Sequence, residues 1–519
     1  MLNGKMFVAL VAATVVFVVG ANGAAAGPSK VSWSNCFSEL GPFQCGTVQV
    51  PLDYDSRNGA KISVALVRLP ATDPARRIGS LFLNPGGPGG SGVDFTLFAG
   101  PFLFTDEVRA RFDLVGFDPR GISRSTALRC FGNPKQWAPV FTPFAFPLTA
   151  EEEQIWMAAD LYLVDACAQR GGKIIDHMST ANVARDLDVL RDAVGDAKLS
   201  YYGVSYGSML GQTYANMFPG NFRALVIDGV LDPIAWANVG GAIPFSTRLR
   251  SDAGAIATLN EFFRLCDAGG ARCAFGPNSA ARYAAMANKL LTDGPVTITF
   301  PDGSTTDLNY STLIGQTLGP LYDSLGWEQF DDLLAFVAGQ VLGTPLSARL
   351  APRTAPELWR PGYITKRGFP QYQNLLEGFP AVACSDSDNP DSYAAWSAAA
   401  AAANVQFGYF GPLWTWITSI CAKWPGADAD RYVGPFNKPT ANPVLVVGNL
   451  FDPATRYEGA VTAHNLLPNS ALLTVHGWGH TSLFLSRCAD GAIARYLIDL
   501  ATPPPGTVCE QDHVPFTAP

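Results

Sequence analysis

The stretch of this chain best suited to chemistry is Gly203-Val204-Ser205-Tyr206-Gly207, which reads G-x-S-x-G. It follows a run that predicts a β-strand and precedes a segment compatible with an α-helix. On such a strand–turn–helix elbow, flanking glycines avoid clashes and the serine hydroxyl stands clear of the sheet edge. The pattern therefore predicts that Ser205 is a nucleophile and that the amide of Tyr206 faces an oxyanion.

A serine nucleophile needs a histidine base and a carboxylate that orients it, and the chain has only 5 histidines. We favour His480, because the glycines before it form a loop able to carry an imidazole over Ser205. His476 ends a predicted strand and is expected to pack or to form a hydrogen bond. Asp452 lies in the turn after the predicted strand 443–449. Both Asp452 and His480 thus follow the carboxyl ends of strands, where open α/β sheets place their chemistry.

A glycine-rich loop at 84–92, Asn-Pro-Gly-Gly-Pro-Gly-Gly-Ser-Gly, follows another predicted strand. Such a loop can present backbone amides to a developing oxyanion, and Gly87 is the favoured second donor. The alternative, a phosphate-binding loop, lacks a following Gly-Lys-Ser/Thr and any G-x-G-x-x-G with a downstream acid. We therefore expect an oxyanion hole made by Tyr206 and Gly87.

Four motifs occur in one order along the chain: the 84–92 loop, Gly-Phe-Asp-Pro-Arg-Gly at 116–121, the 203–207 elbow and Gly479-His480. Together they resemble the secreted tripeptidyl aminopeptidases, a branch of the proline-iminopeptidase group of serine α/β-hydrolases. The resemblance covers nearly the whole chain and implies a serine exopeptidase that releases short peptides, typically tripeptides, from free N-termini. Asp452 and Thr455 match the Asp-x-x-Thr of that family, which makes Thr455 a candidate substrate-binding residue.

The elements that must position these residues follow an α/β pattern. Short β-rich runs at 62–69, 80–83, 112–117, 199–202 and 225–227 alternate with helical segments, and the strand pattern resumes only at 443. We expect an α/β-hydrolase fold with a mostly parallel central sheet and a large, mainly helical lid insertion. The predicted organisation is a signal peptide at 1–26, a first core part at 27–235, a lid at 236–440 and a C-terminal core part at 441–519.

Composition limits the partners. A formal net charge of −8 argues against nucleic acid and anionic membranes, and 48% hydrophobic residues supply a large core. The expected partner is a peptide or small acyl substrate, with no stable membrane association after signal cleavage. The predicted chemistry requires no metal and no organic cofactor, and the oligomeric state stays open.

The first residues resemble an export signal, with Lys5, an apolar stretch at 6–20 and a small-x-small cleavage site at 24–26. An uncleaved anchor is the alternative. Ten cysteines in an exported chain suggest disulfides, so we expect a secreted protein. Pairing in chain order would close five local loops, but connectivity cannot be deduced from sequence; a zinc site is disfavoured because paired C-x-x-C spacing is absent. The cysteines are Cys36, Cys45, Cys130, Cys167, Cys266, Cys273, Cys384, Cys421, Cys488 and Cys509.

Substrate recognition is the least defined part of the sequence. An aminopeptidase must bind an ammonium, and Asp386 and Asp388 are the candidate carboxylates, with Glu377 weaker and a solvated acidic loop as the alternative. Aromatic residues of the predicted lid could line an apolar pocket or simply form its core: Trp396, Phe407, Tyr409, Phe410, Trp414, Trp416 and Trp424. An esterase or amidase on the same scaffold is the nearest alternative function, and an inactive binding protein is a second. An epoxide hydrolase or dehalogenase would need aspartate at the elbow, which Ser205 excludes.

Overall fold

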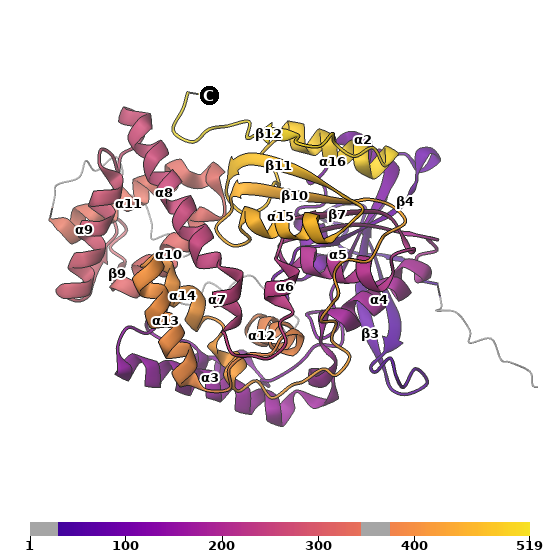
Figure 1. Cartoon of the computed structure of the whole chain (residues 1–519), viewed down its shortest axis with the longest axis horizontal. Coiled ribbons are helices and arrows are strands. Elements are labelled where there is room, and N and C mark those ends of the chain that lie inside the picture. The colour runs from indigo at the N-terminus through magenta and orange to yellow at the C-terminus, as the bar shows by residue number, and fades with distance from the viewer. Residues whose placement is uncertain (1–29, 344–373, 519) are drawn as a thin grey trace, which may run out of the picture.

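The protein is seen in a computed structural model that describes residues 30–343 and 374–518. Within these residues one mixed sheet has the strand order β1-β2-β3-β5-β4-β6-β7-β10-β11-β12 (Figure 1). The pairs from β1 to β5 are antiparallel and all later pairs are parallel. The strands are β1 (Ser34–Asn35), β2 (Gln44–Pro51), β3 (Lys61–Leu69), β4 (Gly79–Asn84), β5 (Phe112–Phe117), β6 (Leu199–Val204), β7 (Phe222–Asp228), β10 (Val444–Phe451), β11 (Ser470–Trp478) and β12 (Val508–Glu510).

Helices cover both faces of this sheet, because its central strands are apolar on both sides. Leu81 and Leu83 of β4 pack into one core with α1, α2 and α16, whereas Phe82 between them packs into a second core with α4, α5 and α15. Alternate side chains of a strand thus hold the two helix layers in place. The helices are α1 (Gly92–Phe98), α2 (Asp106–Arg111), α4 (Thr180–Ala193), α5 (Tyr206–Met217), α15 (Tyr457–Leu466) and α16 (Arg487–Asp499).

A mainly helical segment lies between β7 and β10 and has a core of its own. Phe262 and Trp327 stand near the middle of that core, with ring centroids 5.4 Å apart. Figure 1 shows most of these helices gathered at one end of the molecule, away from the sheet. They are α6 (Pro233–Trp236), α7 (Phe245–Leu249), α8 (Ser251–Gly269), α9 (Ser279–Thr292), α10 (Tyr310–Leu321), α11 (Trp327–Leu342), α12 (Leu375–Asp386), α13 (Tyr393–Phe407) and α14 (Phe410–Trp416), with a hairpin of β8 (Val296–Thr299) and β9 (Thr305–Leu308).

Helix α3 (Ala150–Arg170) belongs to the first part of the chain but packs against this later segment. The indole of Trp156 donates a hydrogen bond to Ser419 Oγ at 3.0 Å, and Ser419 Oγ in turn donates to Asp160 at 2.6 Å. The helical layer beside the sheet therefore includes α3 in addition to helices from the 236–440 range. These bounds of the lid stay a prediction.

The expected α/β-hydrolase architecture is confirmed, and each strand predicted from the sequence is present. No sequence pattern predicted β1, β2, β12 or the β8–β9 hairpin. Helix α4 is amphipathic, with Val183, Leu187 and Leu190 buried. The predicted leader at 1–26 lies outside the described residues. Among the residues that are described, no helix combines the length and apolar character needed to cross a bilayer.

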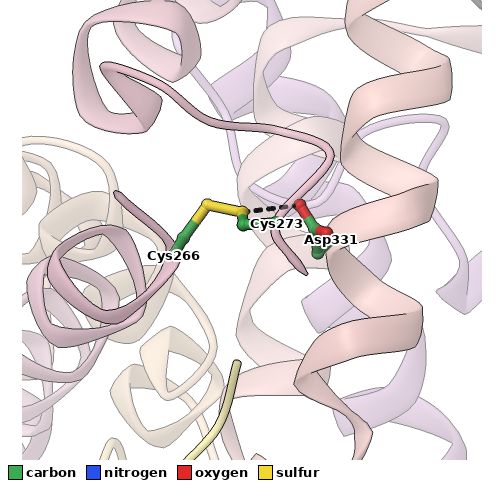
Figure 2. Close-up of side chains that lie close together, drawn as sticks. All are labelled: Cys266, Cys273 and Asp331. Atoms are coloured by element: carbon green, nitrogen blue, oxygen red, sulfur yellow. Dashed lines mark hydrogen bonds between the residues drawn. A yellow bond between two sulfur atoms is a disulfide. The ribbon is translucent and has the colours of Figure 1, made fainter. Parts of the chain in front are cut away.

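All ten cysteines form disulfides, and the pairing follows chain order. Figure 2 shows the Cys266–Cys273 bond beside Asp331, whose Oδ1 lies 2.9 Å from Cys273 Sγ. Burial raises the pKa of Asp331 to about 6, partly opposed by hydrogen bonds from the amides of Phe275 and Ala274. Because both sulfurs are bonded to each other, neither is a thiolate ligand, and the zinc alternative has no support at this cluster.

Candidate active site

Ser205 lies in the turn between β6 and α5, as the G-x-S-x-G pattern predicts. Its φ of 58° and ψ of −126° place a non-glycine residue in a strained region, and its amide donates to the carbonyl of Asp228 at 2.9 Å. Tyr206 is the first residue of α5, so the helix does not use its amide. An amide in this position is available to an oxyanion beside Ser205.

The 84–92 loop packs directly against this turn. An added Cβ at Gly86, which has a φ of +88°, would lie 2.6 Å from the Val204 carbonyl oxygen and 2.8 Å from the Tyr206 nitrogen. The next residue, Gly87, lines a pocket together with Ser205. The loop and the elbow therefore meet at the place where the two predicted oxyanion donors are needed.

Asp452 and His480 lie together at the carboxyl ends of β10 and β11. Nδ1 of His480 is 2.9 Å from Asp452 Oδ1 and 3.0 Å from Oδ2. The same carboxylate also accepts from the amides of Ala454, Thr455 and Thr481 and from the Thr455 hydroxyl. An acceptor this well satisfied fixes Nδ1 as the protonated nitrogen of His480 and leaves Nε2 as a base.

The electrostatics of Asp452 favour its ionised form. Burial alone would raise the pKa of this carboxyl, but the charge and hydrogen bond of His480 and the amides of Thr455 and Thr481 hold the pKa below its ordinary value. Asp452 is 1% exposed. It is therefore a buried carboxylate that can stabilise an imidazolium at neutral pH.

Ser205 lines a pocket that both halves of the chain build. Most of its lining is apolar, and Tyr322 and Thr455, which both contact the His480 ring, face the same space. Of the seven aromatic candidates, Trp414 is part of the lining. The lining residues are Gly87, Ser205, Leu231, Trp236, Phe245, Ser246, Leu249, Ser251, Tyr322, Phe379, Trp414, Thr418, Ala454 and Thr455.

The candidate ammonium-binding carboxylates lie outside this pocket lining. Asp386 is buried and accepts from the amide and hydroxyl of Thr180 and from the indole of Trp236, at 2.8, 2.5 and 2.8 Å. Burial raises its pKa to about 6 against the opposing effect of these bonds. Asp388 accepts from the Gly240 amide and pairs with Arg431 at 2.6 Å. Their role in amine binding stays a prediction, and this geometry does not favour it.

Several residues that support the site had no signal in the sequence. Asp228 accepts from the amide and hydroxyl of Ser482, and Asn449 donates to the Gly479 carbonyl at 2.8 Å, so both brace the loop that carries His480. Tyr322 reaches the same loop from the lid. His476, in contrast, extends from β11 to Glu510 at 2.9 Å, in keeping with the hydrogen-bonding role expected for it.

Comparison with known proteins agrees with this geometry. The α/β hydrolase fold family matches residues 79–248, and the family described as TAP-like protein matches residues 406–509. The Mycobacterium tuberculosis serine protease Hip1 is 33% identical, with 97% of this chain and 96% of that protein aligned. The Streptomyces coelicolor tripeptidyl aminopeptidase is 30% identical over 95% of this chain and 88% of its own length. A Mycobacterium tuberculosis protein named carboxylesterase B is 32% identical, with 92% of this chain and 89% of that protein aligned.

Proposed function

Because the chain belongs to the tripeptidyl-aminopeptidase-like family of α/β-hydrolases, we propose that it is a serine exopeptidase that releases short peptides from free N-termini. The products are tripeptides in this proposal. Ser205, Asp452 and His480 act as nucleophile, orienting acid and base. The amides of Tyr206 and Gly87 form the oxyanion hole.

Catalysis proceeds by acyl transfer. Ser205 Oγ attacks the scissile carbonyl carbon while Nε2 of His480 takes the hydroxyl proton, and Asp452 stabilises the resulting imidazolium. The two amides hold the tetrahedral oxyanion. His480 then protonates the leaving amine, and water, activated by the same imidazole, hydrolyses the acyl-enzyme.

One observation carries this proposal: Ser205 on its strained turn lines a pocket together with Tyr322 and Thr455, and both of these residues contact the His480 ring of the buried Asp452–His480 pair. A carboxylate with a lowered pKa, a histidine bonded through Nδ1 and a serine on an elbow are the parts that acyl transfer needs. The apolar lining beside Ser205 favours a substrate with an apolar side chain next to the cleaved bond.

An esterase is the second candidate, and the pocket supplies the reason. No aspartate or glutamate is among the described residues that line it, although an aminopeptidase is expected to hold an ammonium. The resemblance to a protein named carboxylesterase B points the same way. The peptidase proposal therefore requires an amine anchor beyond this lining.

The deciding experiment compares a tripeptidyl p-nitroanilide with a free amine and its N-acetylated twin, each with an apolar residue before the anilide. We expect cleavage of the free form alone, and its loss by several orders of magnitude in Ser205→Ala. Equal cleavage of both compounds would support the esterase or amidase alternative. Cleavage of neither anilide nor a p-nitrophenyl ester would leave a binding protein.

The expected leader at 1–26 and the five disulfides support secretion, because such bonds persist in oxidising surroundings. The substrate in this proposal is a peptide, with neither nucleic acid nor membrane as a lasting partner. Signal cleavage is checked by N-terminal sequencing of the protein recovered from the culture medium.

A further inference from the structure

Tyr322 connects the lid to the loop that carries His480. It follows directly after α10, and its carbonyl accepts a hydrogen bond from the His480 amide at 2.8 Å. The next residue, Asp323, forms an antiparallel bridge with Gly479. Two consecutive lid residues are thus paired with the main chain of the histidine loop.

The side chain of Tyr322 makes a second contact. Its ring lies against the imidazole of His480, with centroids 4.9 Å apart and an interplanar angle of 66°. This edge-on arrangement is favourable for aromatic rings. Tyr322 also lines the pocket that contains Ser205, so this one residue borders both the imidazole and the substrate space.

The close approach of the two segments is built into the sequence at Gly479. An added Cβ there would lie 2.9 Å from the Tyr322 carbonyl oxygen and 3.3 Å from the Ser324 nitrogen, and the φ of +108° also favours glycine. The side chain of Gln511 adds a further connection. Its Nε2 donates to Ser324 Oγ at 3.0 Å, and its Oε1 accepts from the backbone amide of Trp478 at 2.9 Å. Bonds on both sides of Gly479 therefore hold the lid segment against the histidine loop.

We propose that Tyr322 is a positioning residue for His480, which rests on the proposed function of His480 as the base for Ser205. The Asp452 bond restrains one nitrogen of the imidazole but leaves the ring able to tilt about that bond. The Tyr322 ring blocks the tilt toward the pocket and keeps Nε2 directed at Ser205. The lid thus positions the catalytic base and also forms part of the pocket wall.

The test separates the chemistry of Ser205 from substrate binding. Diisopropyl fluorophosphate forms a bond between Ser205 Oγ and phosphorus and expels fluoride, with His480 taking the proton, and it is small enough to report nucleophile activation with little pocket contact. We expect Tyr322→Ala to lower both kcat and the inactivation rate constant by about 10- to 100-fold, with KM changed far less. Tyr322→Phe, which keeps the ring, should restore both rates to near the wild-type values.

Trp414→Leu is the matched control, because Trp414 lines the same pocket from α14. It should raise KM for the peptide and leave the inactivation rate constant near that of the wild type. If Tyr322→Ala behaves in the same way, or if Tyr322→Phe is as impaired as Tyr322→Ala, the proposal is wrong. Thermal unfolding monitors the fold, and Tyr322→Leu, which fills similar space without an aromatic ring, provides the same comparison if the alanine variant unfolds.

If Ser205 and His480 did not act as nucleophile and base, the reaction with the fluorophosphate would give a different result. In that case the wild-type protein would not react with the fluorophosphate, or Ser205→Ala would react as fast as the wild type. A reactive wild type with an unreactive Ser205→Ala establishes the nucleophile, whatever the Tyr322 variants show.

Discussion

The most constrained residue of the site is Asp452, whose two oxygens accept bonds from His480, from the Thr455 hydroxyl and from three backbone amides. The charge and hydrogen bond of His480, together with the amide donors, hold the pKa of this carboxyl below its ordinary value although it is buried. Thr455, expected at the substrate site, lines the pocket but gives its hydroxyl to this carboxylate. Its arrangement indicates that it orients Asp452, and substrate binding by Thr455 stays a prediction.

Asp452→Asn should reduce kcat by roughly 10³- to 10⁴-fold with little change in KM. The amide that replaces one oxygen cannot accept from its former donors, and it favours the His480 tautomer that carries its proton on the wrong nitrogen. Because Asp452 is not among the described pocket-lining residues, the affinity for substrate should change little in this variant. Steady-state kinetics on the free tripeptidyl anilide measure both constants, and a variant that keeps more than a tenth of the wild-type kcat would contradict the orienting role.

At the scale of elements, the site depends on how closely the 84–92 loop approaches the turn after β6. An added Cβ at Gly86 would meet the Val204 carbonyl oxygen, the Ser205 Cβ and the Tyr206 nitrogen within 2.8 Å, so the loop has no room to move toward Ser205. Gly89 approaches α12 in the same way, since an added Cβ would lie 3.0 Å from the carbonyl carbon of Gly378. The 84–92 loop is therefore held between the turn after β6 and α12.

Gly86→Ala should lower kcat by at least about 100-fold, because the new methyl group must push the loop and the Tyr206 amide apart. Gly220→Ala is the matched control, since an added Cβ at Gly220 meets nothing within 4 Å. Thermal unfolding and kcat are measured for both variants. Equal activity of the two alanine variants would show that the loop is not a part of the oxyanion hole.

The elements that could be predicted from the sequence are those whose pattern lies within one short stretch of the chain. The buried strand β10 begins with a continuous apolar run, and the elbow and the 84–92 loop have glycine patterns that few other structures require. The support from Tyr322 and Asp228 was not predicted, because it depends on contacts between segments more than 150 residues apart. The surroundings of Asp386 were not predicted for the same reason: an acidic residue in a polar stretch gave no sign that Thr180 and Trp236 would donate hydrogen bonds to its carboxylate.

Across the whole molecule, buried acids bear on stability as much as on catalysis. Burial raises the pKa of several aspartates, and for five of them it reaches about 7 (Asp160) or about 6 (Asp228, Asp331, Asp386 and Asp490). Other carboxyls have a lowered pKa, among them Asp452 and Asp188, because bonds to His480 and Arg191 outweigh their burial. The two groups act on stability in opposite directions as the pH changes.

Stability should fall as the pH rises from about 4 to about 7 and change little from this cause above that range. In this window the folded chain holds protons on the five raised aspartates that the unfolded chain, with ordinary pKa values, has released, so folding takes up protons. The stabilisation by Asp452 and Asp188 is present above the ordinary aspartate pKa and is lost as the pH falls through their lower folded values. The unfolding midpoint should therefore be highest near about pH 4.

Scanning calorimetry at constant ionic strength, from pH 4 to pH 8, measures how the unfolding midpoint depends on pH. The Asp160→Asn variant tests the contribution of a single buried acid. The Asp160 carboxyl accepts from Ser419 between α3 and the lid and has the highest of the five raised pKa values, so its removal should flatten the decline between about pH 5 and 7. Asp293→Asn should leave that slope unchanged, because Asp293 pairs with Lys289 at the surface and its pKa is lowered. A midpoint that climbs steadily from pH 5 to 8 would mean that buried acids do not govern the pH response of this fold.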